Sequence, residues 1–150
     1  PDDIVAKMIE MAKVTKDDIV YEPGPGDGRV LIAAVKAGAK KAVGIELDKE
    51  KINEAKEAVK KAGLSDKIEI REGDALQEKG YAEASVVFLY MGEEFDAALK
   101  PNLEKNLKPG SRIVSHRFKM GDWKPDNSIK IRGDDGDEYE LHIWTVKEKK

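Results

Sequence analysis

The sequence predicts an α/β fold: a doubly wound, mostly parallel sheet of seven strands with helices on both faces. Short apolar runs alternate with segments whose apolar residues recur at helical spacing, as in repeated βαβ units. A glycine-rich turn directly follows the first apolar run, and the last two runs flank G-D-D-G-D, which is typical of a hairpin. We expect residues 1–150 to form a single domain, long enough to bury a core.

The first half of the chain is predicted to alternate helices with buried strands. Apolar residues at helical spacing predict helices at residues 2–12, 27–37 and 49–61. Asp2 or Asp3 would cap the first helix, and Gly38 and Gly63 would close the second and third. Apolar runs bounded by charged or turn residues predict strands at residues 19–21, 41–48 and 67–71.

The second half continues this alternation and closes it with the hairpin. Residues 84–91 (A-S-V-V-F-L-Y-M) are almost continuously apolar, as a central parallel strand is. A helix is predicted between Phe95 and Leu107, broken or restarted at Pro101. The remaining predicted strands lie at residues 111–118, 128–132 and 138–146.

Composition excludes several classes of site. Charged residues make up 38% of the chain and nearly cancel, giving a net charge of −3, so the strongly basic surface that favours nucleic acid is missing. Without cysteine there is no disulfide, thiolate nucleophile or Cys-ligated zinc, and we predict no metal site. No signal peptide or apolar stretch of membrane-spanning length is present, so we expect a cytoplasmic protein without a membrane partner. The abundance of Lys and Glu resembles the surfaces of thermophilic proteins.

The most informative stretch runs from Ile19 to Arg29, I-V-Y-E-P-G-P-G-D-G-R. The apolar run ends at Glu22, and the glycines follow at alternate positions: Gly24, Gly26 and Gly28. Glycines allow positive φ and let a ligand touch bare backbone, and the helix behind them offers free N–H groups. Asp27 and Arg29 lie at the start of that helix, where Asp27 could instead be an N-cap.

Two classes of cofactor use such a turn. A dinucleotide fold has G-x-G-x-x-G, with pyrophosphate on the helix N-terminus. Here the spacing is G-x-G-x-G after an acid, which would repel pyrophosphate. The pattern resembles the E/D-x-G-x-G-x-G signature of class I S-adenosylmethionine (SAM) dependent methyltransferases, and SAM carries an ammonium, a carboxylate and a sulfonium but no phosphate. The alternative without a cofactor is an ordinary βα turn.

Acids at the ends of the next two strands extend the predicted cofactor site. Glu46 lies about 20 residues past the glycines, where a carboxylate accepts from both ribose hydroxyls; the alternative is a surface acid. In the methyltransferase pattern an acid at Asp74 accepts from the adenine amino group; the alternative is a turn-stabilising Asp. Leu47 and Ala75 would then contact the adenine faces, and Gly73 belongs to the same predicted site.

The end of the fourth strand, F-L-Y-M-G, narrows the chemistry. Leu89 is a predicted cofactor contact, and the Asn/Asp-Pro-Pro-Tyr/Phe motif of enzymes that methylate exocyclic amino groups is missing. Cytosine C5 enzymes of the usual kind need a cysteine, and the Lys-Asp-Lys-Glu arrangement of 2′-O enzymes has no clear counterpart. Small-molecule O-methyltransferases often use a histidine, and the chain offers His116 and His142. His142 alternates with apolar residues and is predicted to be structural.

A second specific stretch is Ser115 to Asp126, S-H-R-F-K-M-G-D-W-K-P-D. With K-P-G-S-R-I-V before it and L-H-I-W near the end, it resembles a compact group of archaeal and bacterial methyltransferases. That group includes an archaeal protein-lysine methyltransferase and is related to mitochondrial lysine methyltransferases. The similarity covers nearly the whole chain. It departs at Pro23 and Pro25, where members have Leu and Cys or Ser; neither proline donates a backbone N–H, so the loop is stiffer.

This resemblance implies the Rossmann-like class I methyltransferase fold and a SAM-dependent enzyme that methylates lysine side chains of proteins, leaving S-adenosylhomocysteine. A neutral amine would attack the methyl in line, and an apolar mouth lowers the pKa of a lysine. Aromatic faces favour cations, so Tyr90 and Trp123 are predicted to line the acceptor channel. His116 would orient the amine or remove its proton. The alternatives are a lid or core aromatic for Trp123 and a satisfied histidine for His116.

We expect a monomer that acts on a protein with exposed lysines, and we expect no nucleic-acid partner. Other functions remain as alternatives. The chain could methylate a small molecule or RNA, act as a nucleotide-dependent oxidoreductase, or be a non-catalytic module that binds SAM or a nucleotide. Binding of NAD against SAM, and methyl transfer against mere binding, would separate these classes.

Overall fold

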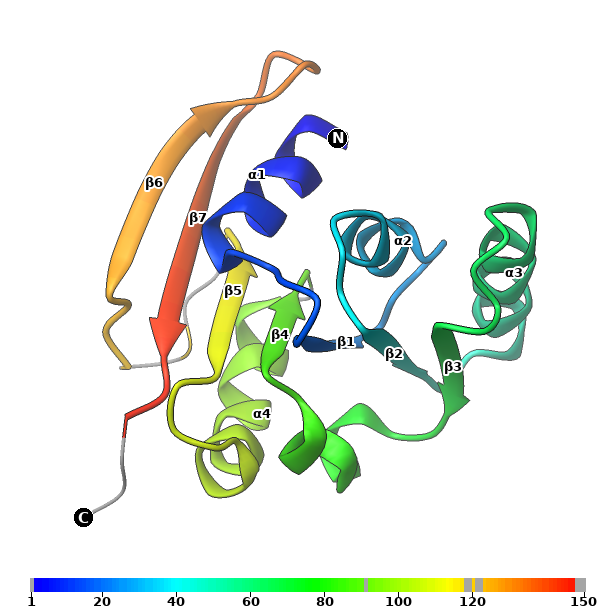
Figure 1. The fold of residues 1–150 in the computed structure, drawn as a ribbon. Coiled ribbons are helices and arrows are strands. Elements are labelled where there is room, and N and C mark those ends of the chain that lie inside the picture. The colour runs from blue at the N-terminus through cyan, green and yellow to red at the C-terminus, as the bar shows by residue number, and fades with distance from the viewer. Residues whose placement is uncertain (1, 91, 118–119, 121–122, 148–150) are drawn as a thin grey trace.

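The computed structural model describes residues 2–90, 92–117, 120 and 123–147 (Figure 1). The described residues form one seven-stranded sheet with the order β3-β2-β1-β4-β5-β7-β6. The strands are β1 (Ile19–Pro23), β2 (Lys41–Glu46), β3 (Ile68–Glu72), β4 (Val86–Leu89), β5 (Arg112–His116), β6 (Asn127–Arg132) and β7 (Glu138–Thr145). The helices are α1 (Asp2–Ala12), α2 (Arg29–Lys36), α3 (Lys49–Lys61) and α4 (Glu93–Asn106), with short 3₁₀ helices η1 (Ala75–Gln77) and η2 (Gly80–Glu83).

The first five strands are parallel, and β7 runs antiparallel between β5 and β6. The chain winds outward from β1 to β3, returns to the other side of β1 with β4, and continues to β5. Ligands in such sheets bind beyond the carboxyl ends of the strands, where the winding reverses. Here that point is the edge formed by the ends of β1 and β4. The predicted α/β fold class is confirmed.

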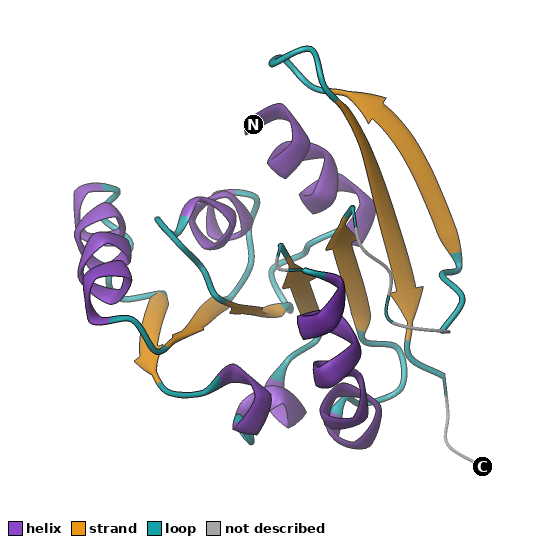
Figure 2. Ribbon diagram, turned by 180° about the vertical axis from the view of Figure 1, so that it is seen from behind, coloured by secondary structure: helices purple, strands orange, loops and turns teal. Residues whose placement is uncertain are grey.

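Helices cover both faces of the sheet (Figures 1 and 2). The helices α1, α2 and α3 bury one side of the core, and α4 with the two 3₁₀ helices buries the other. Side chains of successive strand residues point to opposite faces of the sheet, so each strand contributes side chains to both halves of the core. Among the described residues no helix has the length and apolar character needed to cross a membrane.

Local sequence explains where α3 begins and ends. The Asp48 carboxylate accepts from the backbone N–H groups of Glu50 (2.9 Å) and Lys51 (3.4 Å), as an N-cap does. Ile52, Ala55 and Val59 form the buried stripe, and Gly63 beyond the helix adopts a φ of 73°. The predicted bounds of this helix are confirmed.

The predicted break at Pro101 is wrong, because α4 runs through it. Pro101 is exposed, so the carbonyl group that loses its helical partner can face water. Leu99 and Leu103 are fully buried on either side of it. Asn102 Nδ2 also donates to the carbonyls of Leu76 (3.1 Å) and Glu78 (2.9 Å), which anchors the second half of the helix.

Three predicted strands are shorter than expected by two residues or more, and the run 41–48 is a strand only over Lys41–Glu46. The run 84–91 is a strand only over Val86–Leu89, and the run 111–118 only over Arg112–His116. Met91 and Phe118, the last residues of the latter two predictions, lie outside the described part of the chain.

Candidate functional site

The glycine loop joins β1 to α2 in a left-handed conformation. Gly24, Gly26 and Gly28 have φ values of 61°, 59° and 81°, which side chains rarely adopt. Gly24 N–H donates to the carbonyl of Ile45 (2.9 Å), and Gly28 N–H donates to that of Pro25 (2.9 Å). A Cβ added at Gly26 would meet no atom within 4 Å, so this part of the backbone is open to an approaching ligand.

Pro25 holds the loop against β2. A Cβ added to Gly44 would lie 2.7 Å from Pro25 Cγ and 2.9 Å from Leu31 Cδ1, both too close. The proline ring therefore occupies the space above a residue that must be glycine. The loop conformation is therefore stabilised both by the packing of the Pro25 ring and by the fixed φ of proline.

Glu22 is a buried carboxyl group beneath this loop. It is 2% exposed, and its Oε1 has no hydrogen-bond partner among the described residues. Burial raises the pKa of Glu22 well above its usual value, and the charge of Asp27 adds to the rise. A buried acceptor without a donor fits a ligand that brings a cationic N–H group, as the ammonium of SAM would.

A small hollow of about 100 Å³ lies beyond the ends of β1, β2 and β3. It gathers many of the predicted cofactor residues: Gly24, Glu46, Leu47, Gly73, Asp74 and Ala75. Phe95 from α4 also lines the hollow, and sequence reasoning missed it. Its position in the first turn of α4, the helix that follows the fourth strand, was the sequence signal that could have identified it.

The two acids in the hollow are partly engaged by their own backbone. Glu46 Oε2 accepts from the N–H groups of Leu47 (2.9 Å) and Asp48 (3.1 Å). Asp74 Oδ1 accepts from Leu76 N–H (2.9 Å) and caps η1, which is the turn-stabilising alternative. Each carboxylate has a second oxygen and further lone pairs, so these bonds leave capacity for a ligand.

Asp27 and Arg29 form an exposed ion pair at the start of α2. Arg29 Nη2 lies 2.8 Å from Asp27 Oδ2, and this hydrogen bond lowers the pKa of Asp27. Gly28, rather than Asp27, takes the N-cap position of α2. Leu89, the other predicted cofactor contact, is fully buried at the end of β4, so only its backbone could be offered to a ligand.

Tyr90 and His116 meet at the ends of β4 and β5. Their rings stack with centroids 3.9 Å apart and 13° between planes. His116 is 7% exposed, and its Nε2 has no hydrogen-bond partner among the described residues. Burial lowers the pKa of His116 to about 4, and the nearby Arg117 charge contributes to the fall. The imidazole is therefore neutral at pH 7.

Trp123 does not join Tyr90 and His116. Its ring packs on Trp144, with centroids 6.3 Å apart, on the α4 side of the sheet, whereas Tyr90 packs against the layer of α1 and α2. His142 places Nδ1 2.6 Å from the Ser128 hydroxyl oxygen, within the β6–β7 hairpin. The structure thus brings two of the three predicted acceptor-channel residues together.

Comparison with known proteins places these features in a family context. Residues 22–127 match the family model of the ANTKMT methyltransferase domain. A protein-lysine N-methyltransferase of Saccharolobus islandicus (strain REY15A) is 41% identical over 100% of the chain and 92% of its own length. An adenine nucleotide translocase lysine N-methyltransferase of Mus musculus is 28% identical over 79% of the chain and 52% of its own length.

A solved structure resembles the whole chain. It is an RNA methyltransferase from Salinibacter ruber in complex with S-adenosyl-L-homocysteine, with a TM-score of 0.91 and 37% identity. The match covers 100% of this chain and 94% of the other.

Proposed function

The chain belongs to the ANTKMT methyltransferase domain family, and from this premise we propose that it transfers methyl groups from SAM to lysine side chains of proteins. The observation that carries the proposal is the relation to the Saccharolobus islandicus protein-lysine N-methyltransferase, which extends over the entire chain. The name of the more distant mouse relative also specifies lysine as the residue that is methylated.

SAM is the cofactor of this family fold, since the Salinibacter ruber structure holds its demethylated product. When bound, SAM supplies an electrophilic methyl group on its sulfonium. We propose that Glu22 binds its ammonium and that the glycine loop offers bare backbone to its carboxylate. Glu46 would accept from the ribose hydroxyls, and Asp74 from the adenine amino group, each through capacity left by its backbone bonds.

The acceptor amine would enter beside Tyr90 and His116. A lysine must lose a proton before it can attack, and the half-buried Tyr90 ring makes this mouth poorly solvated, which lowers the pKa of an amine. Neutral His116 has an unpartnered Nε2 that could accept a hydrogen bond from the amine and orient it. Trp123 lies on the other face of the sheet, and we assign it no part in this mouth.

Isotope labelling tests the proposed acceptor. The protein is incubated with a cell lysate and SAM carrying a deuterated methyl group, and the products are digested both to peptides and to nucleosides for mass spectrometry. We expect labelled methyl-lysine. The relation to an RNA methyltransferase favours RNA as a second candidate. Label confined to nucleosides would replace our proposal with that one, and the Glu22→Gln variant controls for other methyltransferases in the lysate.

We further propose that residues 1–150 act as one domain and as a monomer in the cytoplasm, where SAM is made. Among the described residues Leu47 is the only large apolar side chain that is strongly exposed, at 63%, and it lines the predicted cofactor hollow. Light scattering after size-exclusion chromatography tests the monomer, and fractionation of the source cells tests the location.

A further inference from the structure

Arg117, the residue directly after β5, adopts a left-handed backbone conformation. Its φ is 70°, which is strained for a residue with a Cβ. The Arg117 N–H donates to the carbonyl of Glu140 (2.7 Å), so the neighbouring strand β7 holds this turn in place. Strained residues persist where the surrounding structure holds them, and they are concentrated at functional sites. Arg117 lies next to His116 of the proposed acceptor mouth, which makes its side chain a candidate for a part in the reaction.

The turn brings the side chains of His116 and Arg117 to the same aromatic ring. Successive side chains of a strand point to opposite faces, yet both of these contact Tyr139. The His116 ring centroid lies 5.1 Å from that of Tyr139, and the guanidinium carbon of Arg117 lies 4.6 Å from the same Tyr139 centroid. Tyr139 is 5% exposed and its hydroxyl donates to Asp135 Oδ2, so the ring is fixed. The guanidinium is thereby held beside the acceptor mouth.

The charge of Arg117 acts on both side chains of the mouth. Burial is the main cause of the low pKa of His116, and the Arg117 charge is the next, ahead of the charge of the chain's amino terminus. Burial raises the pKa of Tyr90, and the cationic groups around it act against that rise. The charges that bear on Tyr90 are, in decreasing order of effect, those of Arg29, Arg117, Asp135 and Glu22. At both positions the cations therefore outweigh the anions.

Of the two arginines at the mouth, Arg117 is the one without a carboxylate partner. Arg29 Nη2 lies 2.8 Å from Asp27 Oδ2, so its charge is balanced locally. Arg117 forms no ion pair within the part of the chain that the structure describes. Its contact is the face of an aromatic ring. The unbalanced positive charge at the mouth is therefore that of Arg117.

We propose that the positive charge of Arg117 keeps the target lysine in its neutral form when the lysine binds at the mouth. The inference rests on the proposed function, because it takes the methyl acceptor to be an amine. A like charge nearby disfavours an ammonium group, so the lysine loses its proton to water. The freed lone pair forms the new N–C bond, and the electron pair of the broken S–C bond returns to sulfur. Each unit by which the pKa of the bound lysine falls gives about ten times more neutral amine at pH 7.

An arginine at this position could instead bind an anionic group of the substrate, and the two roles predict different kinetics. If Arg117 binds an anion, removing its charge raises KM and leaves kcat unchanged. If it acts on the amine, removing its charge lets the unreactive ammonium form bind more tightly. Then kcat and KM both fall, by about tenfold at pH 7, and kcat/KM stays the same. The effect of Arg117 on both His116 and Tyr90 favours the second role.

Histidine NMR tests the effect of this charge without SAM or methyl transfer. The chain has two histidines, and the His116→Gln variant assigns their signals. Arg117→Asn removes the charge with a residue that tolerates the left-handed conformation, and Arg117→Lys keeps the charge. The pKa of His116 should rise by about half a unit or more in Arg117→Asn and should not rise in Arg117→Lys. An unchanged His116 in Arg117→Asn, or an equal rise in both variants, would overturn the proposal.

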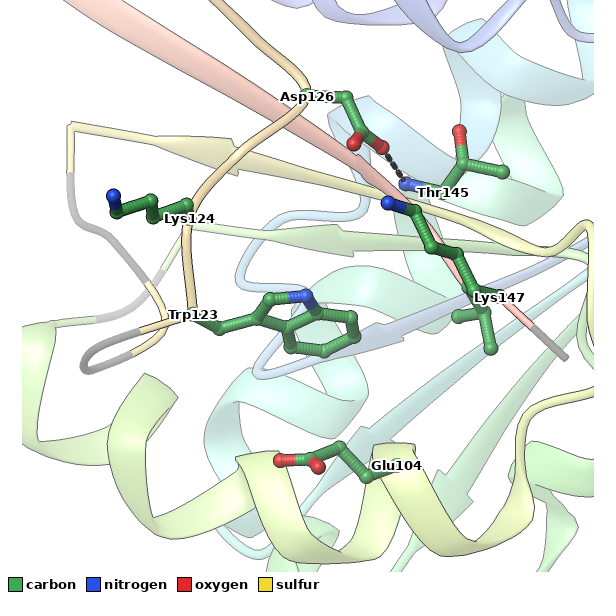
Figure 3. A pocket seen from close by; sticks show the side chains of 7 residues that line it. Glu104, Trp123, Lys124, Asp126, Thr145 and Lys147 are labelled. Atoms are coloured by element: carbon green, nitrogen blue, oxygen red, sulfur yellow. Dashed lines mark hydrogen bonds between the residues drawn. The ribbon is translucent and has the colours of Figure 1, made fainter. Parts of the chain in front are cut away.

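Lys147 provides the matched control. It lines a separate hollow of about 540 Å³ at the other end of β5 (Figure 3). Val146 N–H donates to the carbonyl of Ser111 (2.8 Å), and the chain spans roughly 17 Å from there to His116. This exceeds the screening length of about 8 Å in physiological salt. Lys147→Asn therefore removes one positive charge and should leave the pKa of His116 unchanged. A rise equal to that of Arg117→Asn would assign the effect to net charge and overturn the proposal.

Steady-state kinetics at pH 7 separates the two roles of Arg117. The acceptors are two blocked peptides, acetyl-Gly-Ala-Lys-Ala-Gly-amide and acetyl-Gly-Glu-Lys-Glu-Gly-amide. We expect Arg117→Asn to lower kcat and KM together for both peptides, and Arg117→Lys to behave as the unaltered protein does. A KM that rises for the glutamate peptide alone would replace the proposal with anion binding, and unchanged kcat and KM would also overturn it. Peptides that no variant methylates would count against the proposed function alone, because the histidine titration tests Arg117 independently.

Discussion

The buried carboxyl group of Glu22 lacks a hydrogen-bond partner within the described part of the chain. Its Oε1 has no hydrogen-bond partner among the described residues, and its pKa is well above the usual value because it is buried. Between the unfolded pKa and the raised folded pKa, the folded protein therefore holds a proton that the unfolded chain has already released. Stability from this group is present at low pH and falls as pH rises through the folded pKa. Burial of this carboxyl group therefore lowers the stability of the folded protein at higher pH, and it leaves an acceptor available for a cationic ligand.

The Glu22→Gln variant should separate the effect of Glu22 on stability from its effect on SAM binding. The amide keeps the shape but cannot become a carboxylate, so we expect SAM affinity to fall about tenfold or more while the melting temperature at pH 8 rises. Isothermal calorimetry and differential scanning calorimetry measure the two effects. Asp66→Asn, at an exposed position away from the loop, is the control. Unchanged SAM affinity would remove Glu22 from the cofactor site.

The same carboxyl group should couple cofactor binding to pH. A bound ammonium favours the ionised form of Glu22, so SAM binding below the raised pKa should release a proton, and affinity should increase with pH through that range. Calorimetry in buffers with different ionisation enthalpies counts the protons released. Equal apparent enthalpies in all buffers would contradict this coupling.

Tyr90 tests the acceptor mouth. If its ring shapes a poorly solvated path for the amine, Tyr90→Phe should keep most of kcat, whereas Tyr90→Ala should lower kcat by about tenfold or more and leave SAM affinity intact. Steady-state kinetics with a lysine substrate and SAM calorimetry give the two readings. An active alanine variant would place the amine elsewhere.

His116 should make the fold sensitive to mild acid. Its folded pKa is about 4, whereas an unfolded histidine titrates near 6.5, so between these values the unfolded chain binds a proton that the folded protein excludes. Stability is full above pH 6.5 and falls with pH toward 4, by about 2 kcal/mol at pH 5. Urea unfolding of the unaltered chain and of His116→Gln at pH 7 and pH 5 measures the difference. An equal loss in both proteins would assign the acid sensitivity to other groups.

At the scale of elements, the glycine loop and β2 fit each other through Gly44. A Cβ on Gly44 would come within 2.7 Å of Pro25 Cγ and 2.9 Å of Leu31 Cδ1. We expect Gly44→Ala to destabilise the fold by about 1–3 kcal/mol because the loop must move. Adding Pro25→Ala removes the ring and should recover part of the loss. Urea unfolding of the single and double variants tests this, and simple additivity of the two changes would show that the positions are not coupled.

Elements with strong local signals could be predicted, and those decided by tertiary contacts could not. The helix at 49–61 carries an Asp cap, a regular apolar stripe and a closing glycine, so its bounds follow from local chemistry. Pro101 carries an equally clear local signal for a break, yet the buried Leu99 and Leu103 and the bonds of Asn102 keep α4 continuous. Those contacts come from residues distant in sequence, which no local pattern records.

Over the whole molecule, Asp18 ties together three separate parts of the chain. Its Oδ2 lies 2.8 Å from Arg112 Nη2 and accepts from Thr15 N–H, while Oδ1 accepts from the Ser85 hydroxyl (2.8 Å). Arg112 Nε in turn donates to the carbonyl of Ala12 at the end of α1 (3.0 Å). The cluster joins the end of α1 and the starts of β1, β4 and β5.

Asp18→Asn should weaken this junction by about 2–3 kcal/mol, because it leaves Arg112 without its carboxylate in a site where Asp18 is 4% exposed. Burial pushes the pKa of Asp18 up, but the hydrogen bonds from Arg112, Thr15 and Ser85 outweigh it and leave the pKa lowered. The stability from Asp18 is therefore present above about pH 4 and lost as pH falls through the folded pKa. Urea unfolding at pH 7 and pH 3 should show a gap between the two proteins that narrows in acid.

The cofactor hollow could be predicted, whereas the position of Trp123 could not. Strand ends on one edge of a parallel sheet lie together by construction, so Glu46 and Asp74 were expected near the glycines, and they share a hollow with Gly24. Trp123 follows a stretch without helical or strand periodicity. Its packing on Trp144 depends on how β7 enters the sheet, which is a property of the complete fold.

The insertion of β7 between β5 and β6 also bears on how the protein is made. A ribosome delivers β5 and β6 before β7, so β5 leaves the exit tunnel with an open edge, and β6 has no neighbour in the sheet until residues 138–145 follow. Unpaired strand edges recruit strands of other nascent chains. The seven-stranded sheet therefore cannot be completed until residues 138–145 have been translated. A chaperone that shields the β5 edge during translation would raise the yield of native protein.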